Sequence, residues 1–136
     1  MSETNRVRWG WLRGMYVYTL VLAGGLGVGM LTMPVATASA LGVPYDDPII
    51  FGVVGCVYVA FGLLSAFGLR APLRFAPVLL MQLAYKSVWF AGVALPLVLR
   101  GQFPRYGLSF VVIFASYIIG DVIAIPFSRL FGSEAG

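Results

Sequence analysis

The chain carries four long apolar runs separated by short polar turns, at roughly 15–40, 49–69, 75–99 and 106–127. Each run reaches about 20 residues, the length that an α-helix needs to cross the hydrocarbon core of a bilayer. Within lipid a helix satisfies its own backbone hydrogen bonds, and uninterrupted apolar runs of this length are typical of spanning helices. We therefore predict an all-α membrane protein in which residues 1–136 form one domain, a four-transmembrane-helix bundle.

Composition supports this interpretation and limits the possible functions. The sequence is 60% hydrophobic and only 10% charged, against roughly 25% charged residues in a soluble domain. Histidine is absent and Cys56 is the single cysteine, so we predict no metal site, no disulfide and no cofactor. The net charge of +4 comes from residues that flank the apolar runs. Membrane lipids are therefore the expected partner, and nucleic acid is not.

The arginines predict the orientation of the bundle. Six of them lie before the first run, between the second and third runs, or after the fourth: Arg6, Arg8, Arg13, Arg70, Arg74 and Arg129. The turns that would lie on the opposite side hold only Arg100 and Arg105, together with the acidic pair Asp46-Asp47. Because cytoplasmic loops carry the excess of Lys and Arg, we predict that both termini are cytoplasmic.

Glycines within the first two runs predict close helix contacts. Gly25 and Gly29 are four residues apart in the first run, and Gly55 and Gly62 follow one face of the second. Small residues at such spacings let two membrane helices approach closely. We expect these four glycines to mediate helix packing, either within the chain or against a partner subunit.

The end of the first run allows two interpretations. Pro34 removes a helical hydrogen bond and should kink a helix that continues to about residue 40. Alternatively, the arginines, the apolar stretch and Ala38-Ser39-Ala40 resemble a secretory signal with its cleavage site, although a signal core usually spans only about 7–15 apolar residues. In the turn that follows, Asp47 before Pro48 predicts a helix N-cap with proline at the first helical position.

Two charged residues lie inside the apolar runs, Lys86 in the third and Asp121 in the fourth. An ammonium at the centre of a spanning helix costs on the order of 2.5–3.5 kcal/mol, so a partner is expected. The midpoint between these two positions falls in the turn at 101–105, and an antiparallel hairpin would bring them to similar depth. We therefore predict a buried Lys86–Asp121 ion pair.

Polar and aromatic residues accompany this pair at helical spacing: Gln82, Tyr85, Trp89 and Tyr117. One hypothesis is a structural pair that fixes the register of the last two helices. A second is a ligand site in which Lys86 holds an oxyanion or carbonyl while Trp89 and Tyr117 flank a ring. A third is a proton or ion pathway. No nucleophile and base lie together, so we predict no catalytic residues and no enzyme.

The second half of the chain resembles a known group of proteins. The string Gln82-Leu83-Ala84-Tyr85-Lys86-Ser87-Val88-Trp89, then Pro96, and then Gly120-Asp121-Val122-Ile123-Ala124-Ile125-Pro126-Phe127 are similar to small, uncharacterised bacterial four-span proteins with a YKxxW and DxxxIP signature. This chain has Phe127 where that group has tryptophan, and Arg129 where it has an aromatic residue. The resemblance implies a multi-pass protein of the bacterial inner membrane and brings no activity with it. Size and topology also resemble DoxX-like membrane proteins.

The sequence thus predicts a non-enzymatic membrane protein whose Lys86–Asp121 centre serves a partner subunit or a lipophilic or anionic ligand. The alternative is a small oligomeric transporter coupled to protons or ions. Glycine faces exposed to lipid would favour a partner subunit or a homo-oligomer. A cavity that opens beside Lys86, Trp89 and Tyr117 would instead favour a lipophilic small molecule.

Overall fold

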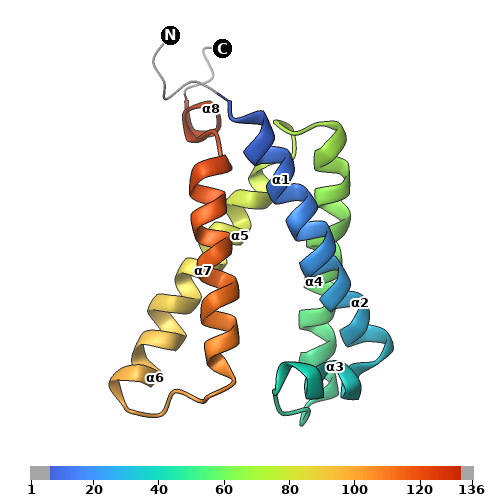
Figure 1. Cartoon of the computed structure of the whole chain (residues 1–136), viewed down its shortest axis with the longest axis vertical. Coiled ribbons are helices and arrows are strands. Elements are labelled where there is room, and N and C mark those ends of the chain that lie inside the picture. The colour runs from blue at the N-terminus through green and yellow to red at the C-terminus, as the bar shows by residue number, and fades with distance from the viewer. Residues whose placement is uncertain (1–6, 133–136) are drawn as a thin grey trace.

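Residues 7–132 are described by a computed structural model, and every regular element in that range is a helix. Four helical segments are long and apolar enough to cross a membrane: Trp9–Thr32, Pro48–Arg70, Ala76–Leu99 and Gly107–Ala124. They run up and down along one long axis (Figure 1). The prediction of an all-α bundle of four spans is confirmed.

Two of the spans contain π-helical segments. The first span consists of α1 (Trp9–Thr19), the π-helix η2 (Leu20–Gly24) and α2 (Gly25–Thr32). The second span is the single helix α4 (Pro48–Arg70), and the fourth is α7 (Gly107–Ala124). The third comprises α5 (Ala76–Trp89), the π-helix η3 (Phe90–Ala94) and α6 (Leu95–Leu99). Short helices α3 (Pro34–Leu41) and α8 (Phe127–Phe131) complete the fold.

The first span ends earlier than the sequence suggested. Met33 leaves the helical region at φ −135° and ψ 64°, and Pro34 begins the separate helix α3. Proline disrupts a helix interior but fits the first helical position, where its missing N–H is no loss. The expected kink is therefore a full break, after which α3 folds back so that Thr37 lies against Gly29. Gly42 then ends α3 at φ 71°.

The turn before α4 has the predicted capping structure. The Asp47 side chain accepts hydrogen bonds from the backbone N–H groups of Ile49 at 2.9 Å and Ile50 at 3.1 Å. Pro48 occupies the first turn of the helix. Asp47 therefore acts as an N-cap, which fixes where the second span starts.

Close packing of α2 on α4 depends on glycine. A Cβ on Gly27 would lie 2.6 Å from the Val59 backbone nitrogen and 2.7 Å from the Gly55 carbonyl oxygen. Gly24 lies one turn before Gly27, and a Cβ on Gly62 of α4 would lie 2.7 Å from the Gly24 Cα. Gly55 and Gly62 thus lie at an intrachain contact, opposite Gly27 and Gly24. Gly25 has no other part of the chain within 4 Å of its Cβ position, so it is not on the packed face.

The densest part of the core lies at the end of the bundle that carries the termini. It is formed by buried residues of α1, α5 and α7 with the start of the final turn: Leu12, Met15, Tyr16, Leu79, Tyr117, Ala124 and Ile125. The Tyr16 hydroxyl donates a hydrogen bond of 2.6 Å to the Pro72 carbonyl and so ties α1 to the turn between α4 and α5. At the opposite end the α2–α4 pair and the α6–α7 pair diverge (Figure 1).

Arginines are more numerous at one end of the bundle, and the acidic pair Asp46-Asp47 lies at the other. The described termini and the turn between α4 and α5 lie at one end, shown at the top of Figure 1. That end carries Arg8, Arg13, Arg70, Arg74 and Arg129. The opposite end carries Arg100 and Arg105 with Asp46 and Asp47. Arg6 lies outside the described residues.

We predict that Gly27→Ala destabilises the bundle by roughly 1–3 kcal/mol, because the added methyl would collide with backbone atoms of α4. Gly25→Ala is the matched control, since it adds the same methyl two residues away in open space. Thermal unfolding of the two variants in mild detergent checks this. Equal melting temperatures would contradict the packing described here.

Candidate functional site

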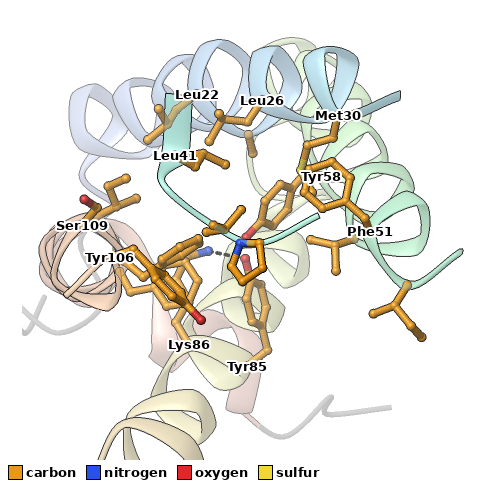
Figure 2. A pocket seen from close by; sticks show the side chains of 18 of the residues that line it. Leu22, Leu26, Met30, Leu41, Phe51, Tyr58, Tyr85, Lys86, Tyr106 and Ser109 are labelled. Carbon is orange, nitrogen blue, oxygen red and sulfur yellow. Dashed lines mark hydrogen bonds between the residues drawn. The ribbon is translucent and has the colours of Figure 1, made fainter. Parts of the chain in front are cut away.

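A cavity of about 440 Å³ lies where the two helix pairs diverge. Its walls come from the first, second and fourth spans and are mostly aliphatic and aromatic, including Met30, Phe51, Tyr58 and Phe110. The loop after α3 and Tyr106 border it as well (Figure 2). The volume falls within the roughly 300–1,000 Å³ that is typical of small-molecule sites.

Lys86 supplies the cationic group of this cavity. Its side chain is only 2% exposed, yet it lines the cavity from α5. The Lys86 Nζ donates a hydrogen bond of 2.7 Å to the Tyr85 hydroxyl, drawn as a dashed line in Figure 2. It also lies 4.2 Å from the ring centroids of Tyr85 and Tyr117 and 5.3 Å from that of Phe114. Aromatic faces attract a desolvated cation, so these rings stabilise the ammonium inside the membrane.

The predicted contact between Lys86 and Asp121 is not formed in this arrangement, although the two charged groups lie within electrostatic reach of each other. Asp121 is fully buried, but neither of its carboxylate oxygens has a hydrogen-bond partner among residues 7–132. The ammonium instead lies against the ring of Tyr117, one turn earlier in α7. Similar depth in a hairpin does not fix the direction in which each side chain points. Here the Lys86 ammonium is held by the Tyr85 hydroxyl and the Tyr117 ring.

A second group of buried polar side chains adjoins Lys86. The Thr19 hydroxyl of α1 donates to the Gln82 Oε1 of α5 at 3.3 Å, and both residues are fully buried. The Gln82 Nε2, the Tyr117 hydroxyl and both Asp121 oxygens have no hydrogen-bond partner in the described part of the chain. We call these four residues, Thr19, Gln82, Tyr117 and Asp121, the polar cluster. Only Tyr117 among them also lines the cavity.

The other predicted site residues separate into two groups. Tyr85 and Tyr117 contact the ammonium, as described above. Trp89 is half-buried and packs edge-on against Phe114, with ring centroids 5.0 Å apart, but it does not line the cavity. Its predicted position beside a bound ring is taken by Tyr58 and Phe114, which do line it.

Three residues of the site were absent from the predicted set. Phe114 lies one turn before Tyr117 in the same helix, so its helical spacing was a usable signal. Thr19 and Tyr58 are two of several polar residues in the apolar runs of the first two spans. Nothing in their spacing indicates contact with the third and fourth spans, because that contact depends on how the two helix pairs dock.

Within residues 7–132 no three His, Cys, Asp or Glu side chains come together in a way that could hold a metal ion. Comparisons of the chain with known protein families, with curated proteins and with solved structures find no match. The site combines a buried ammonium, an apolar cavity and a buried carboxyl group.

We predict that Tyr85→Phe lowers the free energy of unfolding by roughly 1.5–3 kcal/mol, the usual contribution of a hydrogen bond to a charged group. The ring that faces the ammonium is kept, so only the acceptor is lost. Tyr58→Phe is the control, because its hydroxyl lines the same cavity without a hydrogen bond in the described chain. Denaturant unfolding in detergent compares the two. A larger effect of Tyr58→Phe would argue against the assigned role of Tyr85.

Proposed function

We propose that this integral membrane protein binds a lipophilic ligand that carries an oxyanion or a carbonyl oxygen, and that Lys86 holds that oxygen. The observation that supports this most directly is a buried ammonium that borders an apolar cavity and has no carboxylate in contact among the described residues. A desolvated cation of this kind has donors left for a ligand, because the Lys86 Nζ donates one hydrogen bond among residues 7–132.

The chemistry of the walls matches such a ligand. A charge-assisted hydrogen bond from Lys86 would orient the polar group. Aliphatic and aromatic side chains such as Leu26, Phe51 and Phe110 would cover its apolar part. The ligand would enter among spanning helices, so a molecule already dissolved in the bilayer suits the site. A quinone, a fatty acid and a lipid headgroup all fit this description.

The alternative role, a membrane subunit that docks through glycine faces, receives less support. Gly24, Gly27, Gly55 and Gly62 already pack against each other within the chain. We propose a non-enzymatic binding protein of the bacterial inner membrane with both termini in the cytoplasm. The concentration of arginines at the end that carries the termini supports that orientation.

We predict that the protein in mild detergent binds a fluorescent alkyl sulfonate, and that Lys86→Met weakens this binding roughly tenfold to a hundredfold. That range corresponds to the loss of one hydrogen bond to a charged group. A matched alkyl alcohol with the same fluorophore should bind more weakly to the wild type and respond little to the substitution. Fluorescence titration measures both affinities.

Arg100→Met is the control variant, because it removes a cation at the end of α6, outside the cavity lining. It should retain wild-type affinity for the sulfonate. If Lys86→Met and Arg100→Met reduce affinity equally, or if the wild type binds no sulfonate, Lys86 is not the anchor of such a site.

A further inference from the structure

The carboxyl group of Asp121 stands in an environment that does not stabilise a negative charge. It is fully buried, and neither oxygen receives a hydrogen bond from residues 7–132. An ionised carboxylate taken out of water without hydrogen bonds or a paired cation is strongly unfavourable, and such a group becomes neutral instead. The surroundings of Asp121 therefore favour the protonated, neutral form of its carboxyl group.

The charged and titratable groups around Asp121 do not change this conclusion. Lys86 and Tyr85 of α5 are within electrostatic reach and are hydrogen-bonded to each other, but neither donates a hydrogen bond to an Asp121 oxygen. Tyr16 of α1 is also near, and its hydroxyl donates to the Pro72 carbonyl. The Tyr117 hydroxyl of the same helix has no hydrogen-bond partner among residues 7–132, although Thr19 lies beside it. From α4, Tyr58 lies near Tyr85 and Tyr117.

We infer that Asp121, within the polar cluster, is a proton-binding site whose occupancy is coupled to that of the cavity. This inference rests on the proposed function for its second half, the coupling to an anionic ligand. The first half, that Asp121 carries a proton in this arrangement, rests on the burial of its unpartnered oxygens alone.

The coupling follows from competition for one ammonium. When Asp121 loses its proton to water, a buried carboxylate appears near Lys86, and the ammonium is the cation within reach that can neutralise it. Lys86 then turns away from the cavity and forms the pair that the sequence predicted. When Asp121 binds a proton, Lys86 stays against Tyr85 and Tyr117 and is free to hold a ligand oxygen. Proton and anion therefore favour each other's binding, and by linkage the effect is reciprocal.

The absence of histidine makes this coupling measurable. The sequence contains no histidine, so no side chain with an ordinary titration range changes charge between roughly pH 5 and pH 8. The sulfonate probe keeps its charge throughout. A proton taken up from the buffer when it binds below about pH 7 must therefore go to a side chain whose titration the fold has altered.

The test is titration calorimetry of the sulfonate probe in buffers that differ in ionisation enthalpy. At a pH where free Asp121 is ionised in part of the molecules, the wild type should take up a fraction of a proton for each sulfonate bound. Its affinity should fall by up to about tenfold per pH unit as pH rises through the titration of Asp121. Asp121→Asn should bind without proton uptake and keep the low-pH affinity until Lys86 itself loses its proton.

Asp46→Asn is the control for proton uptake, since it removes a carboxylate that lines the cavity but is not part of the polar cluster. Whatever its affinity for the sulfonate, it should take up protons on binding as the wild type does. Binding by the wild type without proton uptake at any pH, or an identical pH dependence in Asp121→Asn, would overturn the coupling.

A second measurement separates this inference from the proposed function. Infrared difference spectra of the ligand-free protein at neutral pH should show the carbonyl stretch of a protonated carboxylic acid, which Asp121→Asn removes and Asp46→Asn retains. If that band is present but no sulfonate binds, the proton site stands and the proposed ligand fails. If sulfonate binds but the band and the proton uptake are both absent, the proton site fails and the ligand site stands.

Discussion

The stabilisation of one buried ammonium by aromatic rings is the interaction on which the site depends. Lys86 has a tyrosine hydroxyl at hydrogen-bond distance and three ring faces around its Nζ. These contacts come from α5 and α7, so they also hold the third and fourth spans together. Because the hydroxyl and the rings stabilise this cation, no carboxylate has to contact it. The cavity therefore borders an ammonium that no carboxylate of the described residues contacts, and Asp121 is buried without a cation in contact.

The unequal packing of the bundle determines where a ligand could lie. At the end with the termini, Leu12, Leu79 and Tyr117 belong to a continuous buried core. Toward the other end, α2 is held to α4 by glycine contacts and therefore does not approach α7. The space that remains is the cavity. The π-helix η2 contributes Leu22 and Ala23 to its wall, and η3 follows the helix that carries Lys86. Irregular turns of this kind often occur at functional sites.

The proposed proton site and the proposed ligand site would both follow from the same charge balance. Two opposite charges in adjacent spans neutralise each other when they touch, and the centre then has no capacity for a third partner. Here they do not touch, so the ammonium can take an anion and the carboxyl group a proton. One proton and one anion together leave the net charge of the centre unchanged, which lowers the cost of holding both inside the membrane.

The sequence by itself determined the secondary structure and the membrane character of this protein. Three features act through local backbone chemistry: the apolar runs of spanning length, Asp47 before Pro48, and the proline at position 34. Their effects could therefore be predicted within a few residues. Pro34 differs only in that it breaks the helix where a kink was expected. The presence of Lys86 and Asp121 inside the membrane was equally clear. Their partners were not, because the direction of each side chain depends on helix rotation. Only the tertiary structure decided that Lys86 lies against tyrosines and a cavity while Asp121 is buried without a hydrogen-bond partner among the described residues. The docking of the helix pairs sets these contacts, and no local sequence pattern encodes that docking.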